Sequence, residues 1–229
     1  MKAMIRSGMY ILRLMPPKWR TVILRKISYH LIDRHATIRI LGKEKLETLG
    51  EPVIFVSNHL SNIDGLILYR MLEDQDVTFL AGVKLRGNWF NRVGLSLVPH
   101  IPIRAGQPDR EAIKRCVGHL KNNRSLFIFP EGTRSRNACL IHGKRGIELI
   151  LRKTGVRIVP LGITGTQHLM PINDHNMAGE WFRNAEVDIR IGDPLELREG
   201  EGVDRIMYAI SQLLPPEYRG VYSTDSRGA

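Results

Sequence analysis

One short segment of the sequence places an imidazole and a carboxylate close together. His59 and Asp64 are five residues apart, which puts them on opposite faces of a strand and about 140° apart on a helix. They can meet only where the chain bends, and the segment is rich in residues that favour turns, namely Asn58, Ser61, Asn62 and Gly65. A carboxylate that orients an imidazole makes a general base for proton abstraction.

The same spacing also has an explanation without catalysis. Asp64 would cap the helix that follows, and His59 would be hydrogen-bonded at the end of the preceding strand. The chain contains eight histidines, so a pair at this spacing is easily met by chance. Taken alone, the spacing favours this second interpretation.

A second polar segment, FPEGTRSR at residues 129–136, also follows a short apolar run. Gly132 allows a ligand to approach the backbone, Thr133 offers a hydroxyl, and the guanidinium groups of Arg134 and Arg136 suit a phosphate. Open α/β sheets bind their ligands where such strands end. An ordinary solvated turn with a basic rim explains these residues equally well.

The elements that must position both segments follow an alternating pattern. Apolar, β-branched runs predict strands at 52–57, 77–81, 125–129, 157–161 and 187–191, the last as an edge strand. Helical patterns occupy 64–72, 108–120, 146–153 and 203–214. The alternation predicts an α/β domain over residues 37–215, with a mostly parallel central sheet flanked by helices. Residues 216–229 are predicted to form a disordered tail.

The positive charge is concentrated near the N-terminus. The chain carries a formal net charge of +11, yet residues 1–43 hold ten basic side chains and only one acidic one. Residues 1–15 and 18–34 fit two amphipathic helices separated by Pro16-Pro17. We interpret residues 1–36 as a basic arm that binds an anionic membrane surface. The alternative is a helical hairpin that packs on the domain and exposes its charges.

Several classes of protein are disfavoured by what the sequence lacks. No run of eighteen apolar residues is present, so no membrane-spanning helix is predicted. The two cysteines and the absence of a His/Cys cluster predict no metal site and suit a reducing cytoplasm. Neither a G-x-S-x-G elbow nor a phosphate-binding P-loop occurs. The arm has an apolar stripe and no known nucleic-acid motif, so we predict no nucleic-acid partner.

Taken together, the two segments resemble a known family. Asn-His-x-Ser-x-x-Asp at 58–64, followed by Phe-Pro-Glu-Gly-Thr-Arg-Ser at 129–135, is similar to the glycerolipid acyltransferases, and most to the bacterial 1-acyl-glycerol-3-phosphate acyltransferases. Weaker similarity extends to residues 101–104, to 158–163 and to the pair Lys144 and Gly146. The resemblance covers about residues 37–195.

The resemblance implies roles for individual residues. His59 would deprotonate the acceptor hydroxyl, and Asp64 would orient His59. The acceptor site would be formed by Arg104, Glu131, Gly132, Thr133 and Arg134. Glu131 would order the loop or pair with an arginine, since a carboxylate repels phosphate. Pro160 would line the acyl channel, and Lys84 would approach either substrate.

The resemblance also implies an O-acyltransferase of phospholipid biosynthesis. It would move a fatty acyl group from acyl-CoA or acyl-ACP (acyl carrier protein) to lysophosphatidic acid, giving phosphatidic acid. Other acceptors remain open, namely glycerol 3-phosphate or another lyso-lipid, as does a non-catalytic protein that binds membrane or nucleic acid. No cofactor or metal is expected, because a thioester is already activated. The expected location is the cytoplasmic face of the cell membrane, as a peripheral protein.

Overall fold

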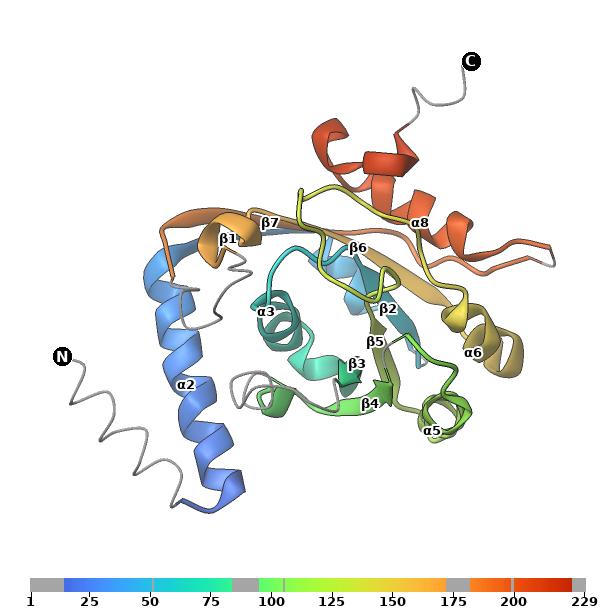
Figure 1. The fold of residues 1–229 in the computed structure, drawn as a ribbon, viewed down its shortest axis with the longest axis horizontal. Coiled ribbons are helices and arrows are strands. Elements are labelled where there is room, and N and C mark those ends of the chain that lie inside the picture. Colours follow the sequence, from blue (N-terminus) through green and yellow to red (C-terminus); the bar gives the residue numbers. More distant parts are fainter. Residues whose placement is uncertain are drawn as a thin grey trace.

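The computed structural model describes residues 15–50, 52–83, 95–104, 106–171, 182–198 and 200–223. Its centre is a seven-stranded sheet (Figure 1). In spatial order the strands are β1 (Ala36–Leu41), β7 (Ala185–Ile191), β6 (Ile158–Thr164), β2 (Ile54–Ser57), β5 (Ser125–Ile128), β3 (Val77–Val83) and β4 (His100–Arg104). Only the β6–β7 pair is antiparallel, which confirms the predicted mostly parallel sheet.

Helices cover both faces of the sheet (Figure 1). One face packs against α3 (Asp64–Met71) and the end of α2 (Pro17–His35), and the other against α5 (Arg110–Lys121), α6 (Gly146–Thr154) and α8 (Val203–Gln212). Shorter helical segments complete the fold, namely η1 (Lys43–Leu46), η2 (Glu73–Gln75), α7 (Thr166–Leu169), η4 (Pro216–Tyr218) and η5 (Gly220–Tyr222).

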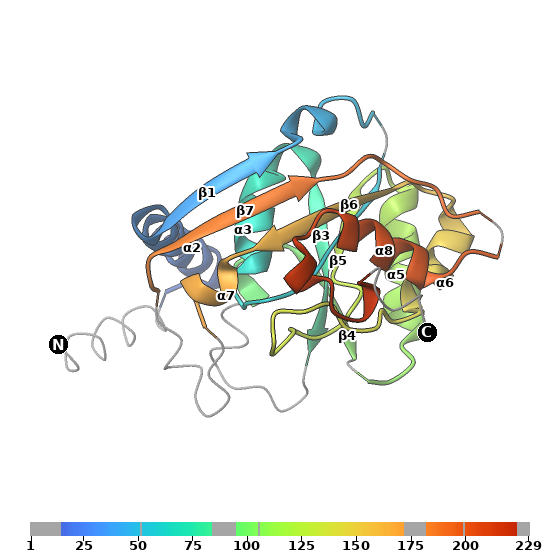
Figure 2. The ribbon, with the colours of Figure 1, turned by 90° about the horizontal axis from the view of Figure 1, so that it is seen from above.

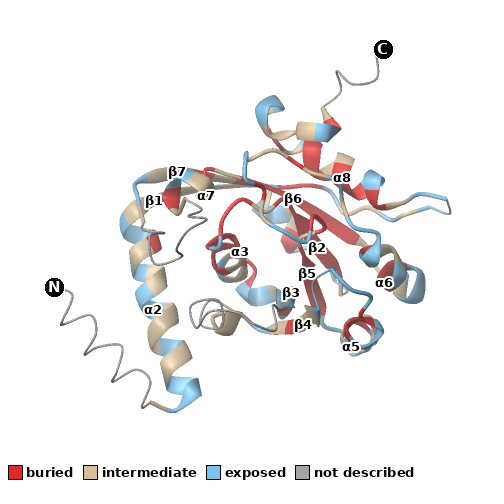
Figure 3. Ribbon diagram, viewed as in Figure 1, coloured by how far each residue is buried: buried red, intermediate tan, exposed pale blue. Residues whose placement is uncertain are grey.

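The central strands are apolar on both faces because both faces are covered. Every residue of β2 and β5 is buried, and six of the seven residues of β6 are buried (Figure 3). Along β2, Phe55 joins the core beneath α3, whereas Ile54 and Val56 join the core beneath α5, α6 and α8. Continuous apolar runs of this kind are what a parallel sheet between two helical layers requires.

The prediction that residues 187–191 form an edge strand is wrong. β7 lies between β1, to which it is parallel, and β6, to which it is antiparallel (Figure 2). The neighbour that covers its outer side is β1, where Ile38 lies opposite Val187. β1 follows α2 directly and was not predicted as a strand. Burial alternates along β1, with one face packed and the other exposed to solvent. The same alternation in the sequence of β7 led to the prediction of an edge strand there.

The prediction of a disordered tail over 216–229 is wrong for the residues that the structure describes. Both η4 and η5 pack on the domain, and Tyr222 is only 3% exposed. The Tyr222 hydroxyl donates to Asp204 Oδ1 at 2.8 Å and accepts from the Gly143 amide at 3.3 Å. Aromatic side chains give this short segment enough apolar surface to bury. Residues 224–229 lie outside the described residues.

The helix predicted at residues 18–34 is confirmed as α2, whereas the helix predicted at 1–15 lies outside the described residues. α2 packs through Ile32, which is buried, and through Arg25, whose Nε donates to the Leu97 carbonyl at 2.9 Å. Trp19 is 62% exposed, and Ile27 is also exposed. Among the described residues, no helix combines the length and apolarity needed to cross a bilayer.

Candidate active site

Several of the residues that the sequence singled out lie at one edge of the sheet. β2, β5, β3 and β4 are parallel neighbours, so their carboxyl ends meet at the same edge. His59 follows β2, Glu131 follows β5, and Arg104 ends β4. Lys84 follows β3 in the sequence but lies outside the described residues. Open α/β sheets bind their ligands at this edge.

The chain bends between His59 and Asp64, and the two side chains meet. His59 Nδ1 lies 2.8 Å from Asp64 Oδ2. An ionised carboxylate only accepts hydrogen bonds, so Nδ1 carries the proton and Nε2 keeps its lone pair. The predicted imidazole–carboxylate contact is therefore confirmed as geometry, in the form that prepares Nε2 to accept a proton.

Asp64 is held by the loop that it closes. Its Oδ2 also accepts from the backbone amides of Leu60 at 2.6 Å and Ser61 at 2.8 Å. The residue is fully buried, and its Oδ1 has no hydrogen-bond partner among the described residues. Asp64 Oδ2 therefore joins the His59 side chain to the backbone of the loop, which fixes the carboxylate relative to the imidazole.

The imidazole plane is fixed by an aromatic neighbour. The His59 ring stacks on Phe129, with ring centroids 4.0 Å apart and an interplanar angle of 14°. The side chain of His59 is 20% exposed, so the dyad is reachable from outside although its carboxylate is not. Two constraints, the stacked ring and the Nδ1 contact, leave the imidazole little freedom to turn.

Glu131 ties the two loops together through the backbone. It is 1% exposed, and its Oε1 accepts from the His59 amide at 2.9 Å while its Oε2 accepts from the Ile141 amide at 3.2 Å. Burial raises the pKa of Glu131 to about 7, although the two amides oppose this shift and the charge of Asp64 adds to it. Both carboxylate oxygens of Glu131 therefore bind backbone amides, an arrangement that orders the loop and matches one of the two roles expected of it.

Two further residues of the 58–64 motif, Asn58 and Ser61, hold the loop that follows β2. The Asn58 side chain donates to the Ile163 carbonyl at 2.8 Å and accepts from the Ile163 amide at 2.9 Å, which prolongs the sheet beyond the end of β2. Ser61 Oγ donates to the Met170 carbonyl at 2.7 Å. Both partners are more than a hundred residues away in the sequence, so no local signal could identify these anchors.

The loop after β5 turns an open flank to solvent. Gly132 has φ +66°, a left-handed conformation that favours glycine. Gly132 and Thr133 are exposed, and Arg134 is partly buried. A Cβ built on Gly132 would lie 2.8 Å from Lys144 Nζ and 2.9 Å from its Cδ. Lys144 thus lies across Gly132, a position that the sequence did not predict.

The Arg104 side chain at the end of β4 contacts Asp109, which lies between β4 and α5. The backbone amide and the Nε of Arg104 both donate to Asp109 Oδ2, at 3.1 and 3.3 Å, and Asp109 Oδ1 caps α5 by accepting from the Ala112 amide. The amides and the guanidinium lower the pKa of Asp109 to about 2. The Arg104 side chain remains 56% exposed.

Pro160 is buried within β6, opposite Val56 of β2. Its carbonyl accepts from the Gly192 amide at 2.8 Å, just past the end of β7, so a proline nitrogen breaks no ladder bond there. Its neighbours Val159 and Leu161 belong to the core beneath α3. Pro160 therefore faces α8, the face opposite to the one on which Phe129 packs.

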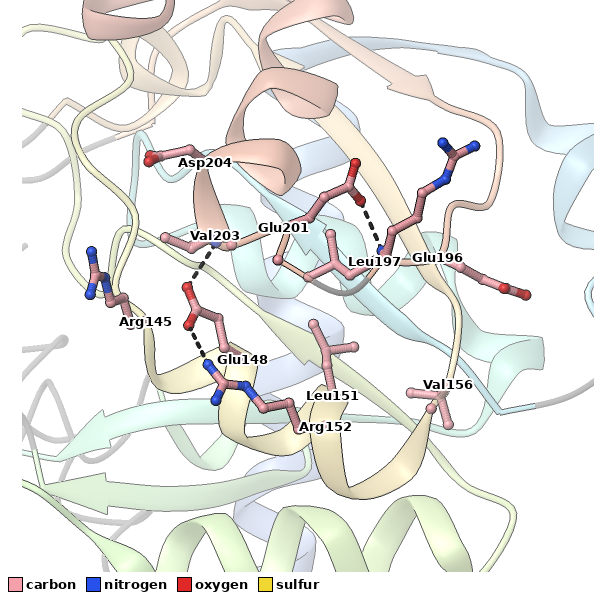
Figure 4. A pocket seen from close by; sticks show the side chains of 14 residues that line it. Arg145, Glu148, Leu151, Arg152, Val156, Glu196, Leu197, Glu201, Val203 and Asp204 are labelled. Carbon is pink, nitrogen blue, oxygen red and sulfur yellow. Dashed lines mark hydrogen bonds and ion pairs between the residues drawn. The ribbon is translucent and has the colours of Figure 1, made fainter.

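One sizeable pocket lies away from all predicted site residues. A hollow of about 850 Å³ separates α6 from the start of α8 (Figure 4). Glu148 in its wall accepts from the Val203 amide at 2.9 Å and pairs with Arg152 at 3.3 Å. Glu148 thus joins α6 to the start of α8, and no residue predicted for the site lines this pocket.

The comparisons with known proteins agree with this geometry. The Acyltransferase family model matches residues 37–164, which is more than half of the chain. The chain belongs to the Acyltransferase family. The matched range contains the dyad, the loop after β5 and Arg104, so the family's own region is the region that carries the site.

Curated relatives and one solved structure extend the match. A chloroplastic 1-acyl-sn-glycerol-3-phosphate acyltransferase of Arabidopsis thaliana is 33% identical over 58% of this chain and 38% of its own length. One of Brassica napus is 33% identical over 68% and 44%. The chain thus spans about two fifths of these relatives. The 1-acyl-sn-glycerophosphate acyltransferase of Thermotoga maritima shares the fold, with TM-score 0.64, 22% identity and coverage of 91% and 87%.

Proposed function

We propose that this protein transfers a fatty acyl group from an acyl thioester to the free hydroxyl of lysophosphatidic acid, forming phosphatidic acid. The observation that carries the proposal is the His59–Asp64 contact of 2.8 Å at the carboxyl edge of the sheet. It is supported by membership of the Acyltransferase family and by the activity in the names of the plant relatives.

In the proposed reaction His59 Nε2 takes the proton of the acceptor hydroxyl as that oxygen attacks the thioester carbonyl. The tetrahedral intermediate then collapses, the C–S bond breaks, and the imidazolium returns its proton to the leaving thiolate. Asp64 stabilises the imidazolium that forms in between. Because the thioester is already activated, we propose that the step needs no metal or other cofactor.

The acceptor is proposed to lie over the loop after β5. The exposed Gly132 and Thr133 leave room for a headgroup, and Arg134 adds a positive charge at the same loop. Arg104 and Lys84 are further candidates along the same sheet edge. Pro160 remains a proposed contact of the acyl chain from the α8 face of β6.

We also propose that the protein works at the cytoplasmic face of the membrane as a peripheral protein. The exposed residues of α2 include Trp19, Ile27, Lys18 and Lys26, which combine apolar and cationic contacts for an anionic bilayer. Replacing both lysines by glutamate reverses two charges, each worth about 1 kcal/mol near such a surface. Liposome sedimentation should show binding weakened by well over tenfold, and unchanged binding would refute this part.

The direct test is an acyl-transfer assay on anionic liposomes that contain lysophosphatidic acid. Long-chain acyl-CoA and acyl-ACP are supplied in parallel, and phosphatidic acid is measured for the wild type and for His59→Ala. Formation of product by the wild type and loss of at least a thousandfold in the variant are expected for a missing base (~10³ or more). Product from neither donor, or equal rates in both proteins, would contradict the proposal.

A further inference from the structure

Lys144 lies on the open side of the loop after β5. Its backbone amide donates to the Pro130 carbonyl at 2.8 Å, which fixes where the side chain starts. Its Cδ, Cε and Nζ atoms all lie within 3.0 Å of the position that a Cβ on Gly132 would take. The absence of a side chain at Gly132 is therefore what lets the lysine cross the loop.

The Lys144 ammonium has no carboxylate partner among the described residues. The carboxylate closest in sequence to Gly132, Glu131, is turned inward and accepts the amides of His59 and Ile141. Lys144 itself is exposed. An exposed cation that lies across a glycine backbone and is not neutralised is suited to an anionic ligand.

The chemistry of the acceptor decides which cation its phosphate can reach. In lysophosphatidic acid the free hydroxyl and the phosphorus atom are only a few bonds apart, so the phosphate must bind close to His59. Gly132 sits between Glu131, which binds the His59 amide, and Ser135, whose amide donates to the His59 carbonyl at 2.8 Å. Lys144 is therefore beside the catalytic loop.

Arg104 is less well placed for this phosphate. β4 is the third strand along from β2, which corresponds to a lateral separation of about 14 Å at the usual strand spacing. Its Nε is also engaged by Asp109, which leads into α5. A headgroup held at Arg104 would carry the hydroxyl away from the base.

We infer that Lys144 binds the phosphate of the acceptor and so places the acceptor hydroxyl at His59. This inference rests on the proposed function and deepens it, because it names the group that recognises the acceptor. The phosphate groups of acyl-CoA offer the same chemistry, so the test must separate the acceptor from the donor.

The experiment measures kcat and KM for lysophosphatidic acid and, separately, KM for the acyl thioester. Lys144→Ala is compared with Lys144→Arg, with Arg104→Ala, and with Lys153→Ala in the last turn of α6 as the matched control. Loss of one charge-assisted hydrogen bond should raise KM for lysophosphatidic acid about tenfold in Lys144→Ala, with kcat nearly unchanged. Lys144→Arg should retain most of the affinity, and Arg104→Ala and Lys153→Ala should change this KM less than Lys144→Ala does.

The outcomes separate the two claims. An unchanged KM for lysophosphatidic acid in Lys144→Ala, or a rise confined to the acyl thioester, would overturn the inference while the proposed function stands. A larger rise in Arg104→Ala than in Lys144→Ala would overturn it as well. Failure of the wild type to acylate lysophosphatidic acid would refute the proposed function, and the role of Lys144 with it.

Discussion

The loops that follow β2 and β5 serve one site but are held in opposite ways. In the β2 loop, Asn58, Ser61 and Asp64 are all buried, and each is bonded to backbone groups. In the β5 loop, Glu131 is buried, whereas Gly132 is exposed. Lys144 lies across Gly132, and no carboxylate in the described part of the chain pairs with it. In the proposed reaction, the first loop fixes the base and the second leaves room for the acceptor.

Because of this difference, we expect substitutions in the two loops to affect different kinetic constants. Changes in the β2 loop should lower kcat, because they disturb a group that acts in the transition state. Changes on the open flank of the β5 loop should raise KM for the acceptor, because they disturb binding that is present before reaction. Glu131 joins the two loops, so it should affect both.

Asp64→Asn should have the largest effect of these substitutions on kcat. The amide removes the charge that stabilises the imidazolium and can force the wrong tautomer on His59. We expect kcat to fall on the order of a thousandfold, with KM for lysophosphatidic acid nearly unchanged. Asp193→Asn, in a side chain that is 86% exposed, is the control. A variant that keeps more than a tenth of the wild-type kcat would contradict the assignment.

Glu131→Gln should have the second-largest effect. The glutamine keeps one acceptor oxygen but presents an amino group to one of the two amides now held by the carboxylate. We expect kcat to fall about tenfold, together with a smaller rise in KM, as an unpaired buried amide costs about 1–3 kcal/mol. Glu148→Gln is a matched control, because Glu148 also accepts a backbone amide but lies away from the dyad. A loss of kcat in both variants would indicate a general effect on folding.

The same substitution should change how stability depends on pH. Burial raises the pKa of Glu131 from 4.5 to about 7. The protonated, neutral carboxyl therefore stabilises the fold below about pH 4.5, and this contribution is lost as the pH rises to about 7. It amounts to at most about 3 kcal/mol. Relative to the wild type, Glu131→Gln should gain stability between these pH values. The melting temperatures of the two proteins are measured across this pH range. A difference between them that is the same at every pH would refute the burial argument.

Gly132→Ala, on the open side of the loop after β5, should have the smallest effect. A left-handed φ costs alanine about 1 kcal/mol, and the new methyl group must push the flexible end of Lys144 aside. We expect KM for lysophosphatidic acid to rise several-fold and kcat to stay close to that of the wild type. Steady-state kinetics with Gly155→Ala, another glycine with positive φ but at the end of α6, provides the control.

The sequence was sufficient for the sheet's centre and for the position of the site. β2, β5 and β6 are continuous apolar runs, and such runs have few alternatives to a strand covered on both faces. The edge strand β1 was harder to predict from the sequence. It follows α2 without a break, and its alternating pattern is that of any half-buried strand. η4 and η5 were missed because their order depends on contacts with Asp204 and Gly143.

The sequence pointed to the residues of the candidate site but not to the contacts that hold them in place. The five-residue spacing of His59 and Asp64 only permits a contact. The loop that brings them together is also anchored by Asn58, which bonds to Ile163, 105 residues away. Lys144 can lie across Gly132 because Gly132 has no side chain, but the sequence does not reveal that these two residues meet. Supports of this kind come from tertiary contacts, whereas residue types and spacing identify the candidates for the reacting groups.

The central claim is that His59 and Asp64 act as one unit. The most direct test compares kcat for His59→Ala, Asp64→Asn and the double variant in the same acyl-transfer assay, because residues that act together lose activity non-additively. We expect that adding Asp64→Asn to His59→Ala causes no further loss of kcat. A double variant that is slower than His59→Ala by the full factor of Asp64→Asn would show that the carboxylate acts independently of the imidazole.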